Sequence, residues 1–229
     1  MRTPIALGPQ QLTIAWQSAS LLLGYPDEAM GDQLDLVEAA APQLPRHVGG
    51  PLLECVARLR ATTLAQLEAD YVETFDSRRR HNLFLTYFAH GDTRKRGVAL
   101  LRFKQTYLSS GYLLDEAELP DHLCVVLEYA ATIDANRGQD LLLDHRAGLE
   151  LLRLGLVEES SLWAGAVEAV CATLPSLKGE ERAAIRKLAA DGPPAEEVGL
   201  TPYGTPAFDP ALRPGSIDLP MPALRGSDQ

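Results

Sequence analysis

The sequence predicts an all-α protein, a single-domain helical bundle of about nine helices followed by a tail. Three observations indicate this class. Nearly every long segment between Gln10 and Asp191 repeats its apolar residues at intervals of three and four, as one face of a helix does. Gly and Pro stand at the ends of these segments, and no alternating run rich in Val, Ile and Thr suggests a hairpin. Hydrophobic residues make up 46% of the chain, enough for a sizeable core.

The first third of the chain is expected to hold four helices. Pro51 suits the first turn of the third helix, because the N–H that proline lacks would have no partner there. In the fourth helix, Tyr71 and Phe75 fall one turn apart on the apolar face. These helices are predicted at 10–24, at 34–41, from Pro51 onward and at 64–75.

The central and C-terminal helices follow a short aromatic segment, 82–88, whose pattern fits a strand and a helix equally. Asp92 or Thr93 can cap the next helix, which reaches Ser109 and is ended by Gly111. Another helix is expected to start at Pro120. Further helices are predicted at 139–154, 158–174 and 179–190.

The organisation of the chain changes at Gly192. Half of the sixteen prolines fall in the last 38 residues, which also hold several glycines. Such a composition predicts a flexible tail and not a helix. We therefore expect an all-helical domain over 1–191 and a Pro/Gly-rich tail over 192–229.

The string "ELPDHL", residues 118–123, is the strongest candidate for site chemistry. Pro120 fits the first position of a helix, which would place Asp121 and His122 in the first turn. The helix dipole there favours the Asp121 carboxylate and disfavours the cationic form of His122. The pair could form an acid–base or metal site, as in a metal-dependent hydrolase, but a capping acid beside a packed histidine is the favoured interpretation.

Aromatic residues gather near the string "YVETFD", residues 71–76. Tyr71 and Phe75 share one helix face, and Glu73 and Asp76 lie one turn apart on another. Core packing explains these aromatics, and so does an apolar groove that receives an amphipathic helix. Carboxylates at the rim of such a groove could hold an arginine pair of the ligand, and Glu118 is a candidate for this role.

Charge is segregated along the chain. The formal net charge is -10, which argues against general affinity for nucleic acid. Residues 77–105 nevertheless hold eight Lys or Arg and one acid, so this segment carries +7 and the rest -17. Arg94, Lys95 and Arg96 begin a helix, where the dipole disfavours cations. Ion pairs within the chain, contact with an acidic partner or an anion, and a nucleic-acid regulator using 78–104 all remain open.

The sequence carries no signature of an enzyme, a metal site or a membrane protein. Cys55, Cys124 and Cys171 are isolated, which indicates packed thiols in a reducing compartment. The known phosphate-loop, nucleophile-elbow and zinc-protease motifs are missing. No apolar run approaches the ~20 residues that span a bilayer. We expect a cytoplasmic protein with no catalytic residue, no metal ligand and no membrane insertion.

Two long strings resemble a known family. They are "YVETFDSRRRHNLFLTYFAHGDTRKRGVALLRFKQTY" and "ELPDHLCVVLEYAA", and "EEVGLTPYG" in the tail also looks similar. Together they resemble the NarJ-type nitrate reductase molybdenum cofactor assembly chaperones, a branch of the all-helical redox-enzyme maturation chaperones that includes the TorD and DmsD types. The resemblance is dense from 71 to 131 and looser from 16 to 190.

The resemblance implies a non-catalytic function. Such chaperones bind the apo alpha subunit of respiratory nitrate reductase at its N-terminal leader-like segment. They assist the insertion of molybdopterin guanine dinucleotide without holding it stably, and molybdenum cofactor biosynthesis proteins are further expected partners; nucleic acid is not. The client-binding residues that it implies are Tyr71, Phe75, Asp76, Pro120, Asp121 and His122, to which the charge argument adds Glu118. In such a protein Arg94, Lys95 and Arg96 are expected to contact an acidic partner or cofactor phosphates.

Overall fold

A computed structural model describes residues 7–91, 93–115 and 118–191, and these residues confirm the all-α class. Within them lie eleven α-helices, and no strand pairs into a sheet. The predicted tail, 192–229, and Asp92 lie outside the described residues. The helices are α1 (Pro9–Leu23), α2 (Met30–Ala40), α3 (Arg46–Arg60), α4 (Leu64–Tyr71), α5 (Tyr87–His90), α6 (Arg94–Ser109), α7 (Leu123–Thr132), α8 (Ala135–Asp144), α9 (Arg146–Glu158), α10 (Ala164–Thr173) and α11 (Gly179–Asp191). Shorter helical turns are η1 (Ala41–Gln43), η2 (Val72–Asp76) and η3 (Arg79–His81).

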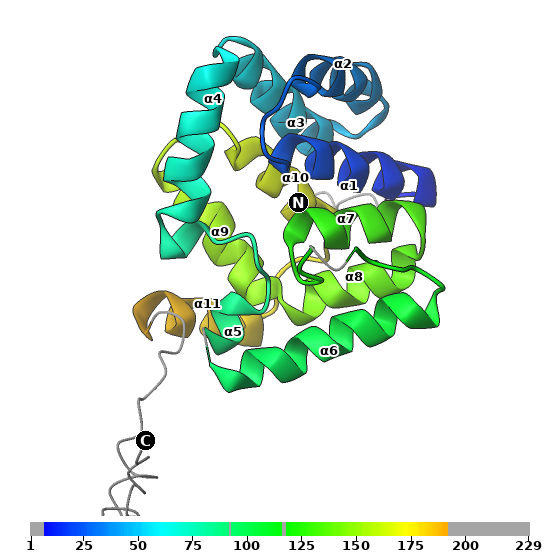
Figure 1. Cartoon of the computed structure of the whole chain (residues 1–229), viewed down its shortest axis with the longest axis vertical. Helices are drawn as coiled ribbons and strands as arrows, with labels where there is room; N and C mark the ends of the chain where they lie inside the picture. The colour runs from blue at the N-terminus through cyan, green and yellow to red at the C-terminus, as the bar shows by residue number, and fades with distance from the viewer. Residues whose placement is uncertain (1–6, 92, 116–117, 192–229) are drawn as a thin grey trace, which may run out of the picture. The chain divides into compact units, whose positions relative to one another are not determined.

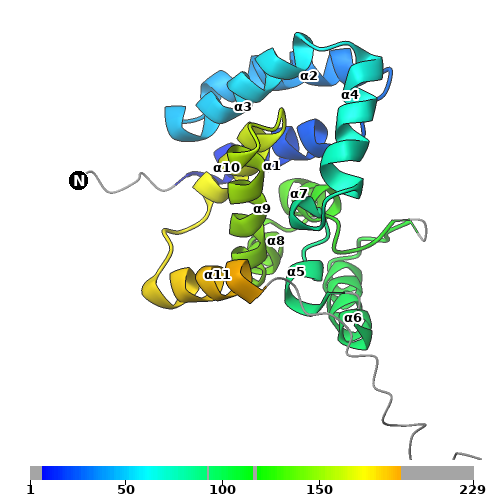
Figure 2. The same ribbon diagram turned by 90° about the vertical axis from the view of Figure 1, so that its left-hand side faces the viewer.

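Helices α1 and α10 form the centre of the helical domain. Helix α1 contacts α2, α3, α7 and α10, while α10 also contacts α3 and α9. Figures 1 and 2 show α1, α7, α8 and α6 following one another through the domain. The Trp16 indole is fully buried and donates to Thr173 Oγ1 at 2.9 Å, which ties α1 to α10. Burial of such a large apolar side chain stabilises the fold by roughly 1.5 to 3 kcal/mol.

Two glycines allow close packing of the segment 79–90 on α9. A Cβ at Gly148 would lie 2.7 Å from the Cβ of Phe88, and one at Gly155 would lie 3.0 Å from the ring of His81. A larger side chain at either position would push this segment away from α9. The segment connects η2 to α6. Its position on α9 therefore sets where α6 and its first cations, Arg94, Lys95 and Arg96, begin.

Several predicted boundaries were wrong. Helix α3 begins at Arg46, so Pro51 lies inside it, and the single helix expected at 139–154 is two helices that break at His145. His145 is the C-cap of α8, and its Nδ1 lies 2.9 Å from the carbonyl oxygen of Leu141. The helix predicted at 158–174 also starts later than expected. Residues up to Glu158 belong to α9, and α10 begins at Ala164.

The 82–88 segment is neither a regular strand nor one helix. Phe84 pairs with His122 in an isolated antiparallel bridge, and α5 begins at Tyr87. This bridge uses the backbone around His122, and helix α7 starts at Leu123 with His122 as its N-cap. The expected helix start at Pro120 was therefore wrong, and Asp121 lies before the helix.

Candidate functional site

An aromatic cluster forms where α4 continues into η2. The amide of Ser77 donates to the carbonyl of Val72 at 3.2 Å, a π-helical bond that widens the last turn. The Tyr71 ring lies 4.7 Å from Phe75 and 5.4 Å from Trp163, measured between centroids. Tyr25 meets the Tyr71 ring edge-on at 5.3 Å and is 54% exposed. Since π-helical turns recur at functional sites, this turn marks the cluster as a candidate site.

Hydrogen bonds to α1 bring the YVETFD and PDH segments together. The Tyr71 hydroxyl donates to the carbonyl of Leu23 at 2.9 Å, and the hydroxyl of Ser20 donates to the carbonyl of Cys124 at 3.0 Å. Burial raises the pKa of Tyr71, and nearby Cys124 and Asp76 add to the rise. Tyr71 therefore stays protonated and acts as a hydrogen-bond donor. The C-terminal half of α1 thus fixes both segments that the sequence singled out.

A groove of about 440 Å³ opens beside the aromatic cluster. Its wall carries Asp70, Glu73 and Glu159 against the single cation Arg78, so its charge is negative. Arg78 joins the two sides, since it pairs with Glu73 at 3.0 Å and also with Glu159. Trp163 lines the same groove, and its indole N–H has no acceptor in the described part of the chain.

Helix α3 holds the far wall of this groove in place. Arg58 donates to the carbonyl oxygens of Ser160 and Ser161, the latter at 2.9 Å. Ser160 has a φ of 52°, a left-handed conformation that costs a non-glycine residue roughly 1 to 2 kcal/mol. The two bonds from Arg58 offset this cost and keep the 159–163 loop beside η2.

Asp121 is a buried junction, and it does not lie on a rim. Its side chain is 0% exposed, and its Oδ2 accepts from the amide of Thr86 at 3.2 Å and from the Thr86 hydroxyl. Arg96 Nη2 lies 3.6 Å from the same oxygen, and Arg96 Nε donates to Thr86 Oγ1 at 3.2 Å. These contacts join the start of α6, the segment before α5 and the segment before α7.

The other residues of the "ELPDHL" string have different exposures. The Pro120 carbonyl accepts from the Tyr107 hydroxyl at 2.6 Å and is buried, while Glu118 is exposed. His122 is half-buried with its ring 5.2 Å from that of Phe84. Burial lowers the pKa of His122, and the charge of Asp121 opposes this shift. His122 is therefore neutral near pH 7. Its ring packs against that of Phe84, which fits the interpretation of His122 as a packed histidine.

The three cations at the start of α6 do not act together. Arg96 turns inward to Thr86 and Asp121, and its guanidinium also lies 5.2 Å from the centre of the Phe84 ring. Arg94 and Lys95 are exposed. Further along, Arg102 pairs with Asp144 at 2.7 Å. Ion pairs within the chain thus account for Arg96 and Arg102, and the exposed pair stays available to a partner.

Sequence reasoning missed half of the groove. Trp163, Glu159 and Asp70 come from a different part of the chain or from a different helix face than the expected residues. Tyr71 and Phe75 lie in the aromatic cluster at this groove, and Asp76 is exposed on η2. Only the isolated Trp after "ESSL" offered a signal, because large aromatics are over-represented at binding surfaces.

Other site chemistry is sparse in the described ranges. No three His, Cys, Asp or Glu side chains come together there as metal ligands would. Burial raises the pKa of Cys55 and of Cys124 to about 12 each, so both are protonated thiols. None of the helices described is long and apolar enough to cross a bilayer.

Comparison with known proteins places this architecture in a family. The family model described as nitrate reductase delta subunit matches residues 35–169, which include both segments of the candidate site. The Bacillus subtilis nitrate reductase molybdenum cofactor assembly chaperone NarJ is 31% identical over 165 residues, which cover 72% of this chain and 90% of that protein.

Other relatives share part of their length with this chain. The Escherichia coli K12 NarJ, named as the same kind of chaperone, is 34% identical over 148 residues, 63% of either protein. The nitrate reductase-like protein NarX of Mycobacterium tuberculosis is 40% identical over 164 residues, 70% of this chain. The chain spans only 24% of the length of NarX.

A solved structure has the same fold. It is a redox enzyme maturation protein of Archaeoglobus fulgidus, which superposes with a TM-score of 0.53 at 23% identity and covers 82% of this chain and 99% of its own. The two NarJ relatives are named as assembly chaperones, which agrees with the resemblance of the YVETFD and PDH strings. The chain belongs to the nitrate reductase delta subunit family, together with the NarJ-type assembly chaperones.

Proposed function

We propose that this chain is a cytoplasmic chaperone for the assembly of a respiratory nitrate reductase. It binds the apo alpha subunit at its N-terminal leader-like segment and supports the insertion of molybdopterin guanine dinucleotide. It holds no cofactor stably, and proteins of cofactor biosynthesis are its further partners. The observation that carries the proposal is membership of a family whose relatives are named as molybdenum cofactor assembly chaperones of nitrate reductase.

The groove between η2 and the 159–163 loop is where we place the leader segment. An amphipathic segment would lay its apolar face over the cluster around Tyr71, where Tyr25 and Val72 are 54% and 43% exposed. Its basic residues would meet Glu73 and Glu159, which line the groove. The -17 carried outside 77–105 would steer a basic ligand toward this surface.

In this proposal Asp121 and His122 stabilise the structure that carries the site. Asp121 is fully buried, so its carboxylate cannot reach a ligand without opening the junction with Thr86 and Arg96. Acidic contacts to the leader therefore fall to exposed carboxylates, among them Asp76 and Glu118. Asp121 would act by holding Pro120 and His122 in place.

The rival functions have less support in the same geometry. A hydrolase would need the Asp121 carboxylate free to act, and that carboxylate is engaged by Thr86 and Arg96. A nucleic-acid regulator would need the basic segment unpaired. Arg78, Arg96 and Arg102 instead pair with carboxylates of this chain.

The test is calorimetric titration of the full chain with a synthetic peptide that matches the N-terminal segment of its cognate alpha subunit. The variant Glu73→Gln with Glu159→Gln removes both partners of Arg78 in the groove. The matched control is Asp35→Asn with Glu38→Gln. These exposed acids of α2 pair with Arg60 of α3, as Glu73 and Glu159 pair with Arg78.

We expect the groove variant to bind the peptide at least about tenfold more weakly, which is ~1.4 kcal/mol. The α2 control should bind as the wild type does. Equal affinities for the groove variant and the wild type would place the leader elsewhere on the molecule. No binding to the wild type would contradict leader recognition itself.

A further inference from the structure

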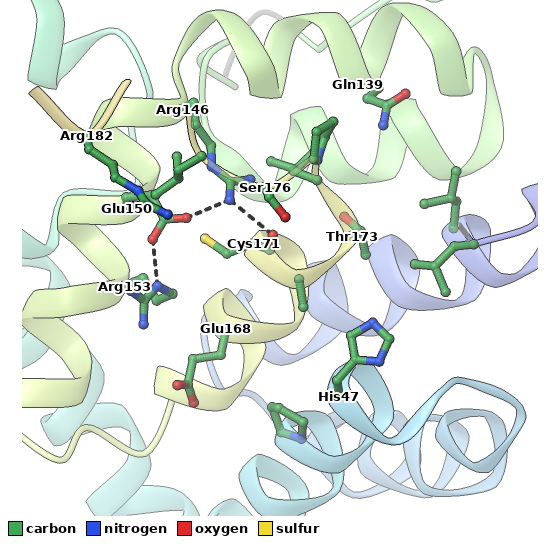
Figure 3. A pocket seen from close by; sticks show the side chains of 17 residues that line it. His47, Gln139, Arg146, Glu150, Arg153, Glu168, Cys171, Thr173, Ser176 and Arg182 are labelled. Atoms are coloured by element: carbon green, nitrogen blue, oxygen red, sulfur yellow. Dashed lines mark hydrogen bonds and ion pairs between the residues drawn. The ribbon is translucent and has the colours of Figure 1, made fainter. Parts of the chain in front are cut away.

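A further cavity lies away from the leader groove. It has a volume of about 920 Å³ and opens between the start of α1, helices α8 to α10 and the segment that leads to α11 (Figure 3). No residue that lines it also lines the groove at Trp163. Cavities of ~300 to 1,000 Å³ commonly hold small ligands.

A buried arginine with unused donors points into this cavity. Arg146, at the start of α9, has a side chain that is only 7% exposed. Its Nη2 donates to Glu150 Oε1 at 2.7 Å and to the carbonyl of Cys171 at 3.3 Å, as the dashed lines in Figure 3 show. Its Nε and Nη1 have no acceptor in the described residues. Buried N–H groups without acceptors are costly, and a guanidinium cannot lose its charge.

The charges around Arg146 leave room for an anion. Glu150 is already shared, because Arg153 Nε donates to its other oxygen at 2.7 Å. With Arg182 the cavity wall holds three arginines against two carboxylates, those of Glu150 and Glu168. The unused donors of Arg146 are therefore available to an anion.

Apolar side chains share the rest of the wall with four polar ones, His47, Gln139, Thr173 and Ser176. Leu12, Pro51 and Leu174 line it from three different elements, and Leu177 closes it from the segment before α11. Apolar walls with a few convergent polar groups are typical of small-molecule sites. An inorganic ion alone would leave these walls uncovered.

We propose that this cavity binds a small organic anion, a carboxylate or phosphate group on an apolar body, with the anionic group held by Arg146. The unpaired N–H groups of the guanidinium fix the position of the anionic oxygens. The apolar walls cover the body of the ligand. This site is separate from the leader groove and does not depend on the proposed function.

The test compares simple probes on the purified full chain by titration and thermal melting. Phenyl phosphate and benzoate carry the two acidic groups on the same ring, benzyl alcohol is the neutral analogue, and inorganic phosphate is the anion without a body. We expect at least one aromatic anion to bind saturably and raise the melting temperature, while benzyl alcohol and inorganic phosphate do so at least tenfold more weakly. Which of the two anions binds tells a phosphate site from a carboxylate site.

Three variants decide whether the probe binds in this cavity. Arg146→Met removes the unpaired donors and leaves Glu150 its second partner, Arg153. Ala172→Trp fills the cavity from its wall and keeps Arg146, so it decides the question if the first variant does not fold. Arg186→Met removes one exposed charge from α11 outside the cavity.

The first two variants should weaken binding at least tenfold, and Arg186→Met should leave it unchanged. Three results would overturn the proposal. These are no binding of either aromatic anion, equal binding of benzyl alcohol, and unchanged anion affinity in Ala172→Trp.

Discussion

Asp121 connects three segments of the helical domain through one carboxylate oxygen. The Thr86 amide and hydroxyl donate to Oδ2, and Arg96 lies close to the same atom. The backbone beside it forms the bridge between Phe84 and His122. A single side chain thus aligns the entrances to α5, α6 and α7.

Replacement of Asp121 should therefore destabilise the fold. We expect Asp121→Ala to lower the free energy of unfolding by about 3 kcal/mol, because Thr86 loses its acceptor and Arg96 its counter-charge in a buried place. Asp76→Ala, an exposed acid nearby, should change it by less than about 0.5 kcal/mol. Urea denaturation measures both, and similar small losses for the two variants would show that the junction does not stabilise the fold.

Protonation of buried histidines should make stability depend on pH. Burial lowers the pKa of His81, His122 and His145 in the folded chain. The unfolded chain takes up these protons near the ordinary value of about 6.5, and the folded chain only at lower pH. The unfolded state then binds more protons, so stability falls as the pH drops below that value.

Urea midpoints measured from about pH 7.5 to about pH 5.5 test this sign, since they span the ordinary histidine pKa. The midpoint should fall toward the acidic end, and His122→Gln should fall less steeply than the wild type. A midpoint that stays flat or rises on acidification would contradict the lowered pKa values.

At the residue scale, the sequence indicated which residue types matter but not their exposure. The string "PDH" predicted a site at Asp121 and His122, and the structure packs them against Thr86 and Phe84. The burial of Asp121 depends on Thr86, which lies 35 positions earlier and carries no local signal. Partners that meet only through the tertiary fold cannot be read from helical spacing.

At the element scale, helices α3 and α10 approach each other closely at one glycine. A Cβ built on Gly165 would overlap the carbonyl oxygen of Pro51, which is backbone and cannot turn away. That carbonyl faces α10 at Pro51, inside α3, where proline removes a helix hydrogen bond. The absence of a Cβ at Gly165 lets α10 lie against α3 at the centre of the domain.

The same substitution should have opposite signs at two glycines. Gly165→Ala should lower the free energy of unfolding by roughly 1 to 3 kcal/mol, because the helices must separate. Gly97→Ala on exposed α6 meets nothing within 4 Å and should raise it by roughly 0.5 to 1 kcal/mol. Thermal melting of both variants tests this, and a stabilising Gly165→Ala would contradict the close approach.

Helix periodicity predicted the elements better than their ends. The stripe on α1 is buried as expected, with Trp16 and Leu22 at 0% exposure. The break at His145 was missed because apolar spacing continues across it, and only a side-chain bond to Leu141 marks it. The π-helical turn after Tyr71 has no sequence signal, since it depends on packing against Trp163.

At the scale of the whole molecule, the all-α fold and the family were predictable, because two long strings of the sequence resemble an all-helical family. The acidic groove was only partly predictable. Glu73 lies in the quoted "YVETFD" string, but Glu159 joins it through Arg78 from the far end of α9. The molecule thus has an acidic groove beside an aromatic cluster, and a separate cavity lined by arginines.

The central claim is that this chain is needed to load molybdenum into a nitrate reductase. The direct measurement is the molybdenum content of the cognate alpha subunit, purified from cells that have or lack this chain, by elemental mass spectrometry. We expect a full molybdenum content with the chain present, and a severalfold loss without it that the wild-type chain restores. An alpha subunit with equal molybdenum content in the absence of the chain would contradict this claim.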